Sequence, residues 1–136
     1  MKKFETYRGA VATWECDSNN HMNVMYYINK FELSGRQCSG KLGINRTFLE
    51  EHDYGIAVVE QNIKYFKEVI EDDLLHIESH LVSYTHKVFT VIHEMYHSDT
   101  LKKVAQMEVK LVLLDKKLRK AAFLPNELQE SFDKLL

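Results

Sequence analysis

The spacing of hydrophobic residues changes once along the chain, from the period of a helix to the period of a strand. Between residues 24 and 42, apolar and small side chains recur at intervals that place them on one helical face. Near the middle of this stripe the side chains are small, at Ser34, Gly35 and Ser39, which lets a helix approach a sheet closely. We therefore predict one long helix in the concave face of a curved sheet. The stripe consists of Val24, Tyr27, Ile28, Phe31, Gly35, Cys38 and Leu42.

Beyond Gly55 the apolar residues alternate with a period of two, which is typical of strands. Four such stretches cover residues 56–65, 74–85, 88–97 and 103–114, and a further strand is predicted at residues 5–14. A short helix is predicted from Asn45 or Thr47 to His52, and Pro125 opens a last amphipathic helix. This order predicts a single α+β domain over residues 1–136, with an antiparallel curved sheet wrapped around one long central helix.

Composition narrows the classes of function. The chain has 136 residues, of which 45% are hydrophobic, enough for one core. Its net charge of −2 argues against a nucleic-acid surface, and its longest aliphatic run, residues 111–114, is too short to cross a bilayer. The N-terminal segment lacks the apolar run of a secretory signal, and two cysteines cannot form a disulfide framework. We therefore predict a cytoplasmic protein without nucleic-acid or membrane partners.

A polar turn precedes the predicted long helix and carries a carboxylate (Asp17), an imidazole (His21) and an amide (Asn23). Free backbone N–H groups and the positive end of the helix dipole favour negative charge at such a position. Asp17 could act as a general base or a nucleophile, or it could be an ordinary turn residue. His21 could orient a substrate or fasten the turn to the backbone. These three residues are therefore the candidates for a catalytic site, and Asn23 is expected to fix the geometry of the turn.

The segment from Asp17 to Tyr27, DSNNHMNVMYY, resembles the D-x-x-G-H-[VM]-N-N-x-x-Y signature of hotdog-fold acyl-CoA thioesterases of the 4-hydroxybenzoyl-CoA-thioesterase-like family. The Asp, His, Asn and Tyr stand at the offsets of the signature, and the predicted element order is similar over nearly the whole chain. Two positions depart from it, because Asn20 replaces the usual glycine and Val24 the usual second asparagine. Asparagine tolerates a positive φ better than other non-glycine residues, so we expect the turn to form.

The resemblance implies hydrolysis of an acyl-CoA thioester at Asp17, with the backbone N–H groups of Val24 and Met25 as the oxyanion site. In hotdog dimers the strand after the helix often lies at the subunit interface, which implies an acyl pocket completed by a partner subunit. Coenzyme A is polyanionic and needs basic surface near the pocket mouth. The predicted pocket residues are Tyr27, Phe31, Glu60, Gln61 and Asn62, and the predicted coenzyme A contacts are Lys64, Ser83, Thr85, His86 and Lys87. No cofactor is implied apart from coenzyme A as part of the substrate.

Several interpretations stay open beside this one. A nucleophilic Cys16 is disfavoured, because strand alternation points it away from Asp17. The seven histidines lack a recognisable metal-binding spacing, so no metal site is predicted. The acyl group could be carried by an acyl-carrier protein, or the domain could be a non-catalytic acyl-binding module. A single curved sheet leaves edge strands to pair, so we predict a homodimer or homotetramer.

Overall fold

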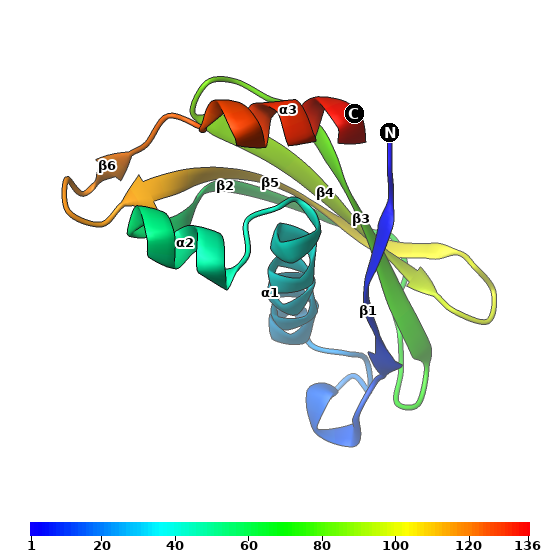
Figure 1. The fold of residues 1–136 in the computed structure, drawn as a ribbon. Coiled ribbons are helices and arrows are strands. Elements are labelled where there is room, and N and C mark those ends of the chain that lie inside the picture. Colours follow the sequence, from blue (N-terminus) through cyan, green and yellow to red (C-terminus); the bar gives the residue numbers. More distant parts are fainter.

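One long helix lies against the concave side of a curved antiparallel sheet (Figure 1). The structure is a computed structural model that describes residues 1–136. The strands follow the order β1-β3-β4-β5-β2, and β6 adds to β5. This arrangement confirms the predicted α+β architecture. In chain order the elements are β1 (Phe4–Ala10), the 3-10 turn η1 (Thr13–Glu15), α1 (Val24–Lys41), α2 (Arg46–His52), β2 (Tyr54–Tyr65), β3 (Leu74–Tyr84), β4 (Val88–His97), β5 (Lys103–Asp115), β6 (Lys120–Ala121) and α3 (Asn126–Leu135).

The boundaries of the elements follow local capping chemistry. Asn45 Oδ1 accepts the Phe48 N–H at 2.9 Å and so begins α2, as predicted. Gly43, with a φ of 92°, turns the chain after α1 in the left-handed region that favours glycine. The first strand is shorter than predicted, because the Glu15 carboxylate accepts the Ala12 N–H at 2.8 Å and curls residues 12–15 into a turn. None of the helices is long and apolar enough to cross a membrane.

The core forms between α1 and the middle strands of the sheet. On α1 the buried stripe includes Tyr27, Phe31 and Cys38, which confirms the helical period read from the sequence. Ser34 is fully buried where α1 meets the sheet, and its hydroxyl donates to the Lys30 carbonyl at 2.9 Å. The first turn departs from the prediction, because Val24 and Ile28 remain exposed. This chain alone therefore leaves the start of α1 uncovered.

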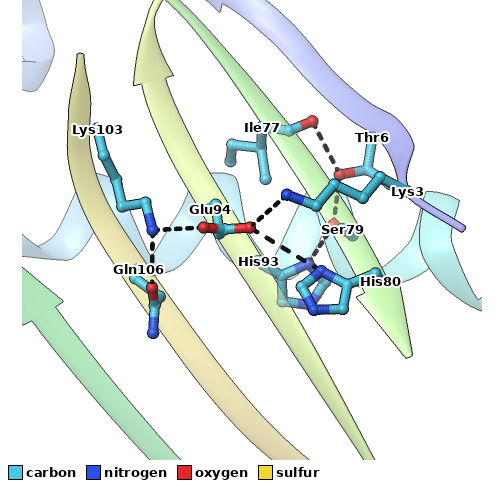
Figure 2. Close-up of polar contacts among 9 residues, drawn as sticks. All are labelled: Lys3, Thr6, Ile77, Ser79, His80, His93, Glu94, Lys103 and Gln106. Atoms are coloured by element: carbon cyan, nitrogen blue, oxygen red, sulfur yellow. Dashed lines mark hydrogen bonds and ion pairs between the residues drawn. The ribbon is translucent and has the colours of Figure 1, made fainter. Parts of the chain in front are cut away.

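A chain of polar side chains crosses the core where β1, β3 and β4 lie side by side (Figure 2). Thr6 Oγ1 lies 2.7 Å from Ser79 Oγ, which lies 2.5 Å from His93 Nδ1. All three residues are buried. Burial, together with the nearby charge of His80 when protonated, lowers the pKa of His93 to about 4. The imidazole of His93 is therefore neutral near pH 7.

On the opposite, convex face of the sheet, Glu94 ties three strands together (Figure 2). Its carboxylate pairs with Lys3, just ahead of β1, at 3.4 Å, and with Lys103 at the start of β5. Burial opposes the charged form of Glu94, but the two lysines outweigh it and hold the pKa of the carboxyl below its ordinary value. His80 Nδ1 lies 3.9 Å from the same carboxylate. Figure 2 shows this group beside the Ser79–His93 pair on the same two strands, since Ser79 and His80 belong to β3 and His93 and Glu94 to β4.

The depressed pKa of His93 predicts a specific pH dependence of stability. The folded value is about 4 and the ordinary value is 6.5, so the unfolded chain binds the extra proton first as the pH falls. Between pH 7 and about pH 4.5 this one group should remove about 2–3 kcal/mol from the free energy of unfolding. In the His93→Gln variant, the free energy of unfolding measured with urea should fall less over the same pH range, by that amount. Equal losses in the two proteins would contradict a buried, neutral His93.

Candidate active site

Asp17 lies in a tight turn between η1 and the start of α1. The Asp17 N–H donates to the His21 carbonyl at 2.9 Å, and the Asn20 N–H donates to the Asp17 carbonyl at 2.9 Å. Asn20 has a φ of 63°, so it takes the left-handed conformation expected of a residue in place of glycine. Asp17 Oδ1 accepts the Asn19 N–H at 2.9 Å, while Oδ2 has no partner in the chain. One carboxylate oxygen therefore shapes the turn, and the other is free to react.

The first residue of α1, which follows the Asp17 turn in the sequence, has a backbone N–H without a hydrogen-bond partner. Asn23 caps the helix, since its Oδ1 accepts the Met25 N–H at 3.0 Å and its carbonyl accepts the Tyr26 N–H at 2.9 Å. The Val24 N–H has no partner within the chain. Of the two N–H groups predicted for the oxyanion site, that of Val24 is open and that of Met25 is engaged by the cap. The oxyanion role itself stays a prediction.

His21 is directed at a neighbouring loop. Its Nε2 lies 3.0 Å from Glu68 Oε2, in the connection between β2 and β3. The next residue strengthens the attachment, because the Met22 N–H donates to the Val69 carbonyl at 2.9 Å. The imidazole thus fastens the Asp17 turn to the β2–β3 connection. Glu68 was not predicted, because it stands in a loop outside any motif.

A buried ion pair holds the same turn against the side of α1. Lys30 Nζ donates to Glu15 Oε2 at 2.6 Å, and the two residues are only 1% and 8% exposed. The remaining acceptors of Glu15 are also used: Oε1 accepts the Ala12 N–H at 2.8 Å, and the carbonyl accepts the Asn23 N–H at 2.8 Å. This pair was not predicted from the sequence. Its only signal was a lysine embedded among the apolar positions of the α1 stripe.

The predicted pocket residues fall into two groups. Tyr27 belongs to the core, where its hydroxyl donates to the Lys67 carbonyl at 3.4 Å and burial raises its pKa to about 12. Residues 60–62 lie along the open edge strand β2 and are exposed. Gln61 donates to Glu32 Oε1 at 3.3 Å. Within one chain none of the three β2 residues is bonded to the Asp17 turn.

The predicted coenzyme A contacts are divided between the two ends of the sheet. Lys64 is paired with Gln106, near the start of β5, at the end where the β2–β3 connection holds the Asp17 turn. Val88, the first residue of β4 after the β3–β4 hairpin, is paired with Val112 of β5. Val112 lies six residues beyond Gln106, which is about 20 Å along a strand. Within one chain, the hairpin candidates therefore lie at the far end from Asp17.

The hairpin candidates also have local structural contacts. Thr85 Oγ1 accepts the Val88 N–H at 3.1 Å, which shapes the turn, and Ser83 is exposed. The side chains of His86 and Lys87 both lie against Phe123: the His86 ring stacks at 5.5 Å, and Lys87 Nζ lies 4.6 Å from the ring centre. Together with Phe123, which is 64% exposed, they form a small aromatic and basic surface. Coenzyme A binding by this surface stays a prediction.

The histidine and cysteine side chains do not converge on a metal-binding geometry. No group of three or more His, Cys, Asp or Glu side chains lies close enough to hold an ion. His76 Nδ1 lies 2.9 Å from Ser98 Oγ, and His97 Nε2 lies 3.3 Å from Asp73 Oδ1. Cys38 is buried, and burial raises the pKa of its thiol to about 12.

The structure contains a large cavity, and of the predicted pocket residues only Phe31 lines it. It measures about 900 Å³ and opens between the second half of α1, α2 and the strands β2, β4 and β5. Its buried walls are Phe31, Ile44, Met107 and Val109, with His93 beside them. Phe31 was predicted for the pocket, whereas Tyr27 and residues 60–62 do not line the cavity. Strand alternation identifies inward residues but does not show that a space remains between them and a helix.

Residues 11–132 match the model of a protein family described as the thioesterase-like superfamily. The chain belongs to this superfamily. The matched segment contains the Asp17 turn, α1 and every strand after it. Membership in the superfamily confirms the resemblance to thioesterases and indicates thioester hydrolysis as the class of reaction. The comparison with curated proteins found no match.

Several solved structures share the fold of this chain. A hypothetical protein of Staphylococcus aureus, solved in complex with CoA, superposes with a TM-score of 0.83 at 20% identity, covering 99% of this chain and 83% of that one. The probable thioesterase YbaW of Escherichia coli gives 0.81 at 24% identity, over 95% and 96% of the two chains. A 1,4-dihydroxy-2-naphthoyl-CoA thioesterase from Synechocystis gives 0.82 at 16% identity, over 98% of each chain. The fold is therefore the hotdog fold, as predicted.

The buried pair of Glu15 and Lys30 can be tested by removing one charge at a time. Lys30→Met leaves a buried carboxylate without its partner, which should lower the free energy of unfolding by about 3–5 kcal/mol. Adding Glu15→Gln should recover part of that loss, because the unpaired charge is then gone. Urea unfolding of the two single variants and the double variant measures the coupling between the residues. Strictly additive losses would contradict a direct buried interaction.

Proposed function

We propose that this protein hydrolyses an acyl-CoA thioester to the free acid and coenzyme A, with Asp17 as its catalytic carboxylate. The observation that carries the proposal is the free Asp17 oxygen in the turn that leads to the open Val24 N–H, at the start of α1. Both belong to a chain of the thioesterase-like superfamily. Coenzyme A as the thiol carrier is supported by the Staphylococcus aureus structure with CoA and by the Synechocystis CoA thioesterase.

Thioester hydrolysis needs a nucleophile and a group that stabilises the developing oxyanion. Asp17 Oδ2 either takes a proton from an attacking water or attacks the thioester carbon itself, forming an anhydride that water then opens. The Val24 N–H donates to the carbonyl oxygen as negative charge develops on it, and the dipole of α1 adds to this stabilisation. One such donor is typically worth about 3 kcal/mol in the transition state. Coenzyme A leaves as the thiolate and takes a proton.

We further propose that two copies of the chain pair along β2, alone or as half of a tetramer. β2 has only β5 as a neighbour on the sheet path, so one edge of a 12-residue strand is open. Val58 and Val59, near its middle, are 46% and 56% exposed. At the start of α1, Val24 and Met25 are 54% and 60% exposed. A second copy along this edge would bury apolar surface and would bring its own β2 toward the Asp17 turn.

The catalytic assignment predicts a large loss of activity in Asp17→Asn, which keeps the size of the side chain but removes its negative charge. Thiol release from a panel of acyl-CoA thioesters should fall at least about a hundredfold. Asp99→Asn, in the exposed turn between β4 and β5, is the matched control and should keep the wild-type rate.

Equal rates for Asp17→Asn and the wild type would remove Asp17 from the mechanism. Turnover of the same acyl groups only on an acyl-carrier protein would replace coenzyme A as the thiol carrier. The absence of turnover on either carrier, in folded protein, would leave a binding module.

The proposed pairing along β2 predicts that a charge placed on the open edge weakens the assembly. Val59→Lys should shift the mass measured by light scattering toward that of one chain, because burying a lysine between two apolar surfaces is unfavourable. Leu101→Lys, at a residue that is 68% exposed in the turn between β4 and β5, is the control and should leave the mass unchanged. A wild-type protein that elutes as a single chain would refute the pairing.

A further inference from the structure

The interior of the cavity carries a single buried polar side chain. Its charged lining residues, such as Glu32, Arg36 and Lys116, are exposed and therefore form the rim. Among the buried lining residues, His93 is the only polar one. Binding sites for small molecules are commonly apolar spaces of this size in which a few fixed polar groups decide which ligand is accepted. His93 is placed to be such a group.

The hydrogen bonds behind His93 fix which of its nitrogens carries the proton (Figure 2). The Thr6 hydroxyl donates to the Ile77 carbonyl at 3.3 Å, since a carbonyl can only accept. The Ser79 hydroxyl, 2.7 Å from Thr6 Oγ1, must then donate to that oxygen. Ser79 Oγ in turn accepts the proton of His93 Nδ1 at 2.5 Å. The neutral imidazole is therefore protonated on Nδ1, and its Nε2 carries a free lone pair.

The second ring nitrogen of His93, Nε2, is free of contacts within the chain. Nε2 has no hydrogen-bond partner in the chain, and it keeps a small solvent-accessible surface. His93 lines the cavity beside Phe31, whose ring lies 6.3 Å from the imidazole. Because burial keeps the ring neutral, Nε2 acts near pH 7 as an acceptor and not as a cation. Its complement in a ligand is an O–H or N–H donor.

We propose that the cavity holds the acyl group of the substrate and that His93 Nε2 selects acyl groups bearing a hydroxyl remote from the thioester. This inference rests on the proposed function, because it names the acyl class of the same reaction. The hydroxyl must be remote, since neither Asp17 nor any other residue of its turn lines the cavity. A plain alkyl chain in the cavity would cover Nε2 and leave it without a hydrogen bond. A volume of about 900 Å³ also fits a long or bulky acyl group better than an acetyl group.

The test compares dodecanoyl-CoA with its monohydroxylated counterparts, in which the hydroxyl occupies successive positions of the distal half of the chain. In the wild type, kcat/KM for the best hydroxylated isomer should exceed that for dodecanoyl-CoA by about tenfold or more. This kcat/KM should also exceed kcat/KM for the matched substrates that carry a ketone or a methyl group at the same carbon, because neither group can donate a hydrogen bond to Nε2. A ratio near one for every isomer, or a preference for the ketone, would overturn the proposal.

Two variants assign this selectivity to His93. His93→Leu should bring the ratio of hydroxylated to plain substrate close to one, while His76→Leu, on the convex face, should keep the wild-type ratio. If His93→Leu does not fold, Ser79→Ala serves instead, because it frees Nδ1 and lets the proton move to Nε2. Ser79→Ala should therefore lower the preference for the hydroxyl. Unchanged ratios in both His93→Leu and Ser79→Ala would overturn the role of His93.

A binding experiment separates this inference from the proposed function. Calorimetric titration with free dodecanoic acid and with its hydroxylated isomers needs no turnover. Tighter binding of a hydroxylated isomer to the wild type, lost in His93→Leu, would support the cavity even in a protein that hydrolyses no thioester. Hydrolysis of dodecanoyl-CoA without any discrimination between plain and hydroxylated chains would support the enzyme and overturn the role of His93.

Discussion

The buried ion pair between Glu15 and Lys30 is the contact on which the candidate site depends. A charge in a protein interior is stable only when it is paired and hydrogen-bonded, and here the lysine and both oxygens of the glutamate have partners. The backbone carbonyl of Glu15 also accepts a hydrogen bond from the N–H of Asn23, the residue that caps α1. The pair thus fixes both ends of the segment that contains Asp17. An apolar pair of the same volume could be equally stable, so we interpret the charges as a device for positioning.

The placement of α1 explains the cavity, which lies beside the open edge of the sheet. α1 packs mainly on β1, β3 and β4, which leaves β5 and β2 without a long helix above them (Figure 1). α2 covers part of this region, and the remaining space is the cavity lined by His93. On the same side of the sheet β2 is the edge strand, because it is last in the strand order, and the start of α1 is also exposed. A substrate and a second copy of the chain are the occupants that we propose for these two unfilled surfaces.

The sequence predicted the architecture because its signals were local. The change of period at Gly55, the cap at Asn45 and the turn at Asn20 each depend on a few neighbouring residues, and the structure agrees at all three. Contacts between distant segments were not predictable in this way. Glu15 and Lys30 meet only after the turn folds back on α1, and a burial pattern alone gives no reason to pair them.

The contacts of the predicted site residues depend in the same way on tertiary structure. The signature identified the turn and the start of α1, but it did not reveal that Asn23 engages the Met25 N–H and leaves that of Val24 open. The cavity depends on the exact distance between α1 and the sheet. Its polar group, His93, belongs to no motif in the sequence, and only the contact with Ser79 distinguishes it from the other histidines.

A crystal structure of Asp17→Asn with dodecanoyl-CoA bound would test the central claim most directly, because this variant should bind the thioester without hydrolysing it. We predict that the thioester carbonyl oxygen accepts the Val24 N–H, that the side chain at position 17 faces the carbonyl carbon, and that the acyl chain enters a cavity walled by Phe31 and His93. A thioester bound away from the start of α1, in a protein whose turn is intact, would contradict the account.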